Sequence, residues 1–443
     1  MNTAIVVGSG AGGATVANEL QGAFQVTVLE EGRPFRRATM DWKTIEQLRR
    51  ARLLVDERLL RVALPAIRVR KSHDMVLVNA VAAGGTTTIS TGNGMRLDDD
   101  LRSIGIDLDP EFDQIAREVP ITTGNQRRWH RTTRRLFEVV DTMGLDPFVT
   151  PKMATSDKCR HCGRCVFGCP YGIKWDTRAF LDQAVSRGAE LVTGARVHRI
   201  VIEGDRATGV LVGGPFGARF HSADLVVVAA GGFGTPAILE RSGITCEHHL
   251  FVDPVLTVAA RMPGAWQCNE IEMPFVVRRP HYILSPYFDW ISALFDPAWR
   301  HPLPDIVGVM IKLADEEGGS VSSRGRIEKL LTATDRARLE DGVGVATEIL
   351  TGLGANPASV FRGTINAGHP GGTLPLTEAT ATTFHDERLP DNVYVADASL
   401  FPRSLGGPPI LTIIAMAKHV ASLCRADAGR FAHRRRRIRD RTR

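Results

Sequence analysis

Four cysteines lie within eleven consecutive positions of the chain, in a spacing suited to binding a metal cluster. They are followed at once by a proline and are Cys159, Cys162, Cys165 and Cys169. Gaps of two, two and three residues are those of loops that ligate iron–sulfur clusters, because they curl the chain so that successive thiolates face one cluster. Gly163 and Gly168 supply the backbone freedom that such a loop needs. The run therefore predicts a 4Fe–4S cluster.

The sequence leaves the fourth ligand of that cluster open. The run is of the bacterial ferredoxin type, and in ferredoxins with two clusters its fourth cysteine serves the other cluster. Here only one run exists, so Cys169 would close the site, or a remote cysteine, Cys246 or Cys268, would replace it. Three ligands alone would suit a three-iron cluster. The alternatives are a structural zinc ion, which prefers paired Cys-x2-Cys knuckles with longer gaps, and a loop without metal.

A glycine-rich turn near the start of the chain indicates a bound dinucleotide. Apolar residues 4–7 predict a short buried strand, and residues 14–20 predict a helix. Between them stands Gly-x-Gly-x-x-Gly, the turn that joins strand to helix in dinucleotide-binding domains. Gly8 permits the tight turn, Gly10 lets a pyrophosphate approach the backbone, and Gly13 lets the helix pack on the strand. The phosphates would then lie at the helix N-terminus.

A second strand, predicted over residues 25–29, ends in an acidic residue. Glu30 follows the last glycine of the turn at close to the distance, about 20 residues, at which a carboxylate binds a ribose diol. Glu30 suits the adenosine ribose of FAD and that of a nicotinamide cofactor equally well. The choice between these cofactors rests on later segments.

Three later segments combine glycine-rich turns with polar residues. Residues 84–94 contain Gly-Gly-Thr-Thr-Thr and Gly-Asn-Gly, residues 225–243 form a buried strand followed by Gly-rich, Thr-Pro and Ser-Gly motifs, and the strand 393–396 ends in Asp-Ala-Ser. With the N-terminal turn and the block 369–419, they resemble the glucose–methanol–choline (GMC) family of flavoprotein oxidoreductases. The resemblance is strong at both ends of the chain and faint between residues 246 and 366.

The resemblance implies an α/β fold with FAD as cofactor: a Rossmann-like FAD-binding domain, an antiparallel-sheet substrate domain and a cysteine-rich insertion. The residues that it places against the ADP part of FAD are Gly8, Gly10, Gly13, Glu30 and Val197. Val197 would contact the adenine through its backbone. Those that it places along the pyrophosphate, the ribityl chain and the flavin are Gly85, Thr86, Asn93, Asp397 and Ala398.

His369 stands in a His-Pro-Gly-Gly-Thr segment that resembles the histidine motif of the family. There the histidine removes the hydroxyl proton of the substrate as hydride leaves for the flavin, and a pKa of ~6.5 leaves imidazole neutral near pH 7. The family usually places a second histidine or an asparagine where this chain has Pro408, which offers neither donor nor base. Asn366 is the substitute that the sequence offers. An apolar helix is predicted over residues 412–423.

The resemblance also divides the chain into domains. The FAD-binding domain comprises residues 1–245, with the cysteine loop 151–178 inserted in it, and returns at residues 366–424. Residues 246–365 would form the substrate domain, and residues 425–443 a basic tail.

The composition fits a folded enzyme and not a nucleic-acid-binding protein. Of the 443 residues, 43% are hydrophobic and 23% charged, which allows sizeable cores. The net charge of +6 arises from eight arginines in residues 430–443, whereas a nucleic-acid enzyme spreads its positive charge over a binding face. The tail is expected to be a mobile, solvated end, or a dock for anionic lipid or an acidic partner.

The sequence predicts a cytoplasmic protein. The apolar residues 4–7 are interrupted by Gly8, far short of a signal sequence, and no later apolar run approaches ~18 residues. Clustered cysteines without an export signal indicate a metal site in a reducing compartment rather than a disulfide framework.

Two redox centres of this kind favour one function over two others. FAD would accept two electrons as hydride and a cluster would pass them on singly, so we expect a dehydrogenase that oxidises a small alcohol-type substrate and reports to a ferredoxin, quinone or cytochrome. A cluster-fed reductase of carbon–carbon double bonds and an electron-transfer subunit without its own substrate are the alternatives.

Overall fold

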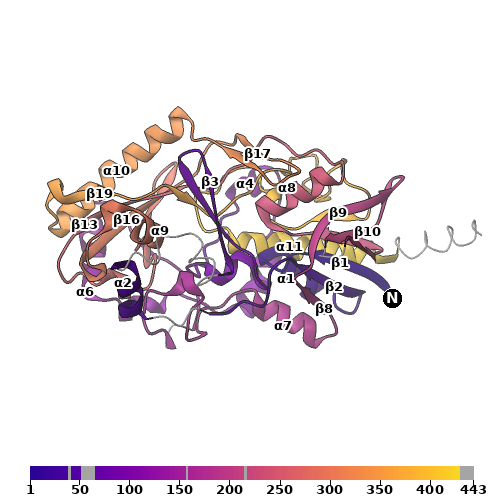
Figure 1. The fold of residues 1–443 in the computed structure, drawn as a ribbon, viewed down its shortest axis with the longest axis horizontal. Helices are drawn as coiled ribbons and strands as arrows, with labels where there is room; N and C mark the ends of the chain where they lie inside the picture. The colour runs from indigo at the N-terminus through magenta and orange to yellow at the C-terminus, as the bar shows by residue number, and fades with distance from the viewer. Residues whose placement is uncertain (38–40, 51–64, 156–157, 214–216, 430–443) are drawn as a thin grey trace, which may run out of the picture.

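The computed structural model describes residues 1–37, 41–50, 65–155, 158–213 and 217–429. The described chain forms two parts that lie side by side, one around the sheet that contains the N-terminus and one around a larger sheet (Figure 1). The arginine-rich stretch 430–443, for which a mobile end or a docking role is expected, lies outside the described residues.

The first part is built on a five-stranded sheet whose strand pairs are all parallel. In spatial order its strands are β21 (Val393–Val395), β12 (Leu225–Val228), β1 (Asn2–Val7), β2 (Phe24–Glu30) and β8 (Glu190–Thr193). Parallel strands are covered by their crossover connections and therefore read as apolar runs; Val6, Val28 and Val227 are fully buried. The strands expected over residues 4–7 and 25–29 are confirmed.

Helices and a second, antiparallel sheet cover these strands. The elements that pack here are α1 (Ala11–Glu19), α7 (Arg178–Ser186), α8 (Gly231–Arg241), α11 (Ile410–Ala426) and the three-stranded sheet of β9 (Arg196–Glu203), β10 (Arg206–Gly213) and β11 (Arg219–Ser222). The helix expected over residues 412–423 is α11. It begins directly after Pro409, at a helix start where proline is tolerated because no N–H is needed there.

The second part is a nine-stranded, mostly antiparallel sheet. Its strands are β3 (Ile67–Ser72), β4 (Met75–Ala80), β20 (Asn366–Ala367), β13 (Val255–Arg261), β16 (Ile306–Leu313), β15 (Tyr282–Pro286), β14 (Phe275–Arg278) and β6 (Phe148–Val149), with β19 (Val360–Arg362) beside β13. Helix α10 (Ala333–Leu353) packs on this sheet, and α6 (Arg131–Thr142) packs on α10. The α/β fold with an antiparallel second sheet is the fold class that the sequence predicts.

The remaining elements are short. They are α2 (Trp42–Arg50), α4 (Asp99–Ser103), α5 (Asp109–Glu118), α9 (Trp290–Phe295), the strand pairs β5 (Ile121–Thr122) with β7 (Lys152–Met153) and β17 (Gly319–Val321) with β18 (Ile327–Lys329), and the 3-10 turns η1 (Gly85–Ile89), η4 (Cys165–Phe167) and η9 (Ala398–Leu400). The turns η1 and η4 contact each other, and η1 also contacts α1 of the first part and β4 of the second.

The turn between β1 and α1 has no room for side chains. Gly8 has a φ of +94°, a left-handed conformation that glycine adopts at no steric cost. A Cβ at Gly13 would lie 2.0 Å from the carbonyl oxygen of Gly8, and a Cβ at Gly12 would lie 1.5 Å from that of Ala396, after β21. The N-terminus of α1 therefore reaches the edge of the sheet through backbone-to-backbone contact.

We predict that Gly12→Ala disrupts this contact. A methyl group 1.5 Å from the Ala396 oxygen forces α1 away from β21, and overpacking of this kind costs about 1–3 kcal/mol or more. Gly344→Ala in α10 is the matched control, because nothing lies within 4 Å of its Cβ and alanine in a helix is favoured by about 1 kcal/mol. Urea denaturation should show Gly12→Ala less stable and Gly344→Ala at least as stable as the parent. Equal midpoints for the two variants would contradict the packing described.

Candidate active site and cysteine cavity

A cavity of about 410 Å³ lies at the carboxyl ends of the parallel strands, where α/β sheets bind ligands. Eleven of the residues that the sequence analysis selects line it: Gly8, Gly10, Glu30, Gly85, Thr86, Asn93, Val197, Asn366, His369, Asp397 and Ala398. Gly13, the remaining one, packs beneath against Gly8. The structure therefore brings residues from distant segments of the chain to one elongated cavity.

The end of the cavity near β1 and β2 has the features of a dinucleotide site. The carboxylate of Glu30 accepts hydrogen bonds from the backbone and the hydroxyl group of Ser9, at 3.0 and 2.6 Å, and from the backbone of Gly32 at 2.7 Å. Burial raises the pKa of Glu30. A Cβ at Gly85 would lie 2.7 Å from the Cα of Gly10. Two glycine loops thus face each other without side chains, and this leaves a backbone cradle that fits a pyrophosphate.

Asp397 joins two elements, α8 and η9, at the other end. Its carboxylate accepts hydrogen bonds from the Thr235 hydroxyl group at 2.5 Å and from the backbone of Gly231 and Ser399, at 2.8 and 2.9 Å. The side chain is therefore occupied in holding η9 against α8, and the backbone here lines the cavity. Pro408 to Ile410 line it as well, so the N-terminus of α11, with its partial positive charge, begins at the cavity wall.

His369 lies beside a buried ion pair that the sequence analysis did not identify. Its Nδ1 atom lies 3.6 Å from Oδ2 of Asp253, and the Lys312 ammonium lies 3.1 Å from the same oxygen. Ser404 donates a hydrogen bond to the other oxygen of Asp253. Burial alone would raise the pKa of Asp253, but Lys312 and His369 outweigh burial and lower it. Burial and Lys312 lower the pKa of His369.

Asn366, the expected substitute for the missing second catalytic residue, is turned elsewhere. Its amide group donates to Asp289 at 3.3 Å and to the Thr364 carbonyl at 3.2 Å. The groups that approach His369 from the wall are instead Asp253 and Lys312, which also line the cavity. A lysine within the otherwise apolar strand β16 was the signal in the sequence that could have indicated this pair.

All four cysteines of the run line a second, smaller cavity of about 30 Å³. Cys246 and Cys268, the remote candidates for a fourth ligand, do not line it. Cys169 has a φ of +42° and Gly168 a φ of +91°, and the backbone N–H of Lys174 lies 3.5 Å from Cys169 Sγ. The loop is therefore curled back on itself with its thiols inward, and one of them accepts an N–H group.

Two fully buried lysines face the thiols. Lys152 and Lys174 line the cysteine cavity, and among the described residues neither ammonium group forms an ion pair with a carboxylate. Burial lowers the pKa of both lysines, that of Lys152 to about 8. Burial likewise raises the pKa of nearby Glu272 to about 8 and that of Cys165 well above its ordinary value. Two buried ammonium groups thus line the same small cavity as the four thiols.

The same lysines hold the wall that separates the two cavities. Lys174 donates to the carbonyl oxygens of Thr87, Thr88 and Ser90 at 3.1, 2.8 and 2.7 Å. Lys152 donates to the Asn93 side chain and to the Glu272 carbonyl oxygen, the latter at 2.5 Å. The segment 87–93 is thereby fixed between both cavities.

The wall between the two cavities is one residue thick in places. Thr91 lines both cavities. Val166 and Phe167 follow Cys165 directly and line the large cavity, while Cys165 lines the small one. Phe167 packs edge-on against Trp290, with ring centroids 5.3 Å apart. Groups bound in the two cavities would accordingly be neighbours across one layer of residues.

A histidine and a glutamate close the cysteine cavity on a further side. His161 lines it, and its Nδ1 atom lies 2.7 Å from Glu270 Oε1. The Nε2 atom of His161 is buried without a partner among the described residues. His130, His161 and Glu270 are the one set of such side chains in the described chain whose ligand atoms gather within 4.8 Å. The four thiols are not drawn together into a group of that kind.

The chain matches a known family over more than half of its length. The model of the GMC oxidoreductase N-terminal region matches residues 2–263. An uncharacterized GMC-type oxidoreductase of Mycobacterium tuberculosis is 30% identical, with 94% of this chain and 75% of that protein covered. A long-chain-alcohol oxidase of Arabidopsis thaliana is 22% identical, with 94% of this chain and 67% of that protein covered.

Two solved structures share the fold. Pyridoxine 4-oxidase from Mesorbium loti superimposes with a TM-score of 0.67 at 16% identity, and 95% of this chain and 99% of that one are covered. Formate oxidase from Aspergillus oryzae superimposes with a TM-score of 0.70 at 14% identity, and 97% of this chain and 99% of that one are covered. At these identities the likeness concerns the fold alone. In the described chain, every helix is too short or too polar to span a bilayer.

We predict that Lys312→Met destabilises the protein by about 3–5 kcal/mol, because it leaves the buried Asp253 carboxylate without its cation. The double variant Lys312→Met/Asp253→Asn should recover a large part of that loss, since it removes both charges. Guanidinium denaturation of the parent and of the single and double variants measures the coupling. Additive effects of the two substitutions would show that the pair does not interact as described.

Proposed function

Because the chain belongs to the GMC oxidoreductase family, we propose that it is an FAD-dependent dehydrogenase that oxidises a CH–OH group and delivers the electrons to an external acceptor through an iron–sulfur cluster. Family membership makes it a flavin oxidoreductase of alcohols or similar donors. The dehydrogenase assignment, the cluster and the roles of individual residues are our proposal. Its principal support is the contiguity of the two cavities, whose shared wall includes Thr91.

The large cavity fits FAD. The glycine cradle at Gly10 and Gly85 would hold the pyrophosphate, Glu30 the ribose diol, and the backbone at Asp397 and Ala398 the flavin end. When bound, FAD supplies an acceptor for the hydride of the substrate C–H bond. The N-terminus of α11 favours negative charge at that end of the cavity.

His369 would take the hydroxyl proton of the substrate at Nε2. Asp253, 3.6 Å from Nδ1, orients the ring and stabilises its protonated form, as the aspartate does in hydrolytic triads. Lys312 keeps Asp253 ionised at the same time as it disfavours premature protonation of His369. This arrangement compensates for Pro408, which stands where the family usually has a second polar residue. The substrate cavity with its base also speaks against an electron-transfer subunit without its own substrate.

The spacing of the four cysteines favours an iron–sulfur cluster over zinc. A zinc ion binds thiolates at about 2.3 Å and so holds them in a compact tetrahedron, whereas a cluster keeps its thiolates farther apart. Four thiolates around a 4Fe–4S core in its usual oxidised state carry an excess negative charge, which the ammonium groups of Lys152 and Lys174 would balance. Such a cluster supplies a one-electron exit, and this favours a dehydrogenase over the oxidases among the relatives.

A panel of alcohols first identifies one that bleaches the flavin without air. In His369→Ala we expect the rate of this bleaching to fall by about 10²–10⁴-fold, while FAD stays bound. The neutral imidazole is the proton acceptor and its pKa is lowered, so the rate in the parent should stay constant as the pH falls through ~6.5 and decline only at lower pH. Stopped-flow absorbance measures both effects. Unchanged bleaching in His369→Ala would exclude it as the base.

We expect protein purified without air to contain four iron and four acid-labile sulfide atoms per chain, the content of the proposed 4Fe–4S cluster. Cys169→Ser should lower the iron content or convert the cluster, because Cys169 lines the cavity. Cys246→Ser, buried elsewhere, should leave it unchanged. A parent protein with zinc or without metal would refute the cluster and leave the flavin assignment standing.

A further inference from the structure

Part of the cysteine loop reaches the molecular surface. Cys159 and Cys162 are partly exposed, and Tyr171, two residues after the last cysteine, is 42% exposed. The indole N–H of Trp42 donates to the Cys162 carbonyl oxygen at 3.0 Å and so fixes α2 beside the loop. A group held by the thiols would therefore lie close to solvent here.

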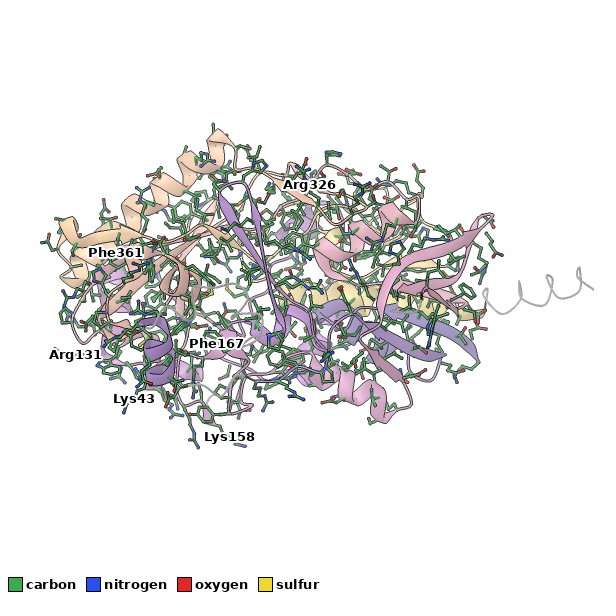
Figure 2. The ribbon with its side chains drawn as sticks, viewed as in Figure 1. Lys43, Arg131, Lys158, Phe167, Arg326 and Phe361 are labelled. Carbon is green, nitrogen blue, oxygen red and sulfur yellow. The ribbon has the colours of Figure 1, made fainter. Side chains whose placement is uncertain are left out.

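Basic side chains surround this part of the surface. They come from four separate segments and form what we call the basic rim: Arg37, Lys43, Arg128, Lys158 and Arg160, all exposed. Figure 2 shows Lys43 and Lys158 along one edge of the molecule, with Arg131 farther along the same edge.

Contacts tie the rim to the loop. The Arg160 guanidinium lies over the Tyr171 ring, 4.6 Å from its centroid. The Arg37 guanidinium lies 2.7 Å from the point where a Cβ of Gly172 would stand. The rim is thus a feature of the cysteine loop and its immediate neighbours.

Four of the five rim side chains form no ion pair with a carboxylate that the structure describes. In the parts of these segments that the structure describes, Asp41 is the exposed acidic residue. Arg37, Lys43, Lys158 and Arg160 form no ion pair with any described carboxylate. Exposed arginines elsewhere do, as Arg326 does with Glu328 at 3.2 Å and Arg362 with Glu340 at 2.6 Å. A local excess of this kind attracts an anionic partner and accelerates its association.

We propose that the basic rim docks an acidic one-electron carrier protein of the ferredoxin type, which takes electrons from the cysteine centre. The inference rests on the proposed function, since it assigns an acceptor to that cluster. A protein is favoured over a lipid surface because the basic residues lie beside a loop whose Cys159 and Cys162 are partly exposed. Electron-transfer complexes also need only small interfaces, below about 1,200 Å², of the size that a single loop with its neighbours offers.

The test compares binding of three probes to the holoprotein purified without air: an acidic 2Fe–2S ferredoxin, basic cytochrome c, and vesicles containing phosphatidylserine. Titration calorimetry at about 20 mM and about 200 mM salt should show ferredoxin binding that weakens about tenfold or more at the higher salt. The double variant Lys43→Glu/Lys158→Glu should weaken it by at least about tenfold at low salt. Cytochrome c should not bind.

Arg326→Glu provides the matched control, because it also reverses an exposed positive charge but lies at the opposite edge of the molecule (Figure 2). It should leave ferredoxin binding within about twofold of the parent. The proposal is overturned if the double variant binds ferredoxin as tightly as the parent does. It is also overturned if the double variant loses binding to the vesicles and not to ferredoxin. Iron and sulfide assays on the same samples separate the outcomes: absent iron refutes the cluster alone, whereas intact iron without charge-sensitive binding refutes the docking surface alone.

Discussion

Two buried ammonium groups, those of Lys152 and Lys174, hold the segment between the large cavity and the cysteine cavity. Each donates hydrogen bonds to this wall, and neither has a carboxylate partner among the described residues. Burying an ammonium group without a carboxylate partner is costly, and an anion bound at this place would offset part of that cost. In the proposed function, thiolates around an iron–sulfur core would supply such an anion, and the hydrogen bonds of the same lysines hold the wall beside the large cavity.

The parallel sheet determines what lies on the other side of the wall. Its strands β1, β2, β12 and β21 all end at one edge, and their following turns carry Gly8, Glu30, Gly231 and Asp397. Because the residues here are small or polar, backbone N–H groups and the carboxylate of Glu30 line one end of the cavity. The antiparallel sheet closes the other end with β13, β16 and β20, and β16 carries the lysine that supports Asp253 and His369.

Local patterns in the sequence sufficed for some of this architecture. Apolar runs beside glycine turns predicted β1, β2 and α1, and the cysteine spacing singled out thiols that line one cavity. The ion pair of Asp253 with Lys312 was missed, because the two residues are 59 positions apart and only strand pairing brings them together. Asn366 was the substitute for Pro408 that the sequence offered, because it is near His369 in sequence, but its amide group donates to Asp289.

The account stands on two redox groups placed on either side of Thr91 and Phe167. Crystals grown without air, with diffraction recorded at the iron and zinc absorption edges, test it most directly. It predicts an iron anomalous peak enclosed by Cys159, Cys162, Cys165 and Cys169, together with density for FAD in the adjoining cavity. A peak at the zinc edge only, no peak among the thiols, or a flavin lying away from this wall would contradict it.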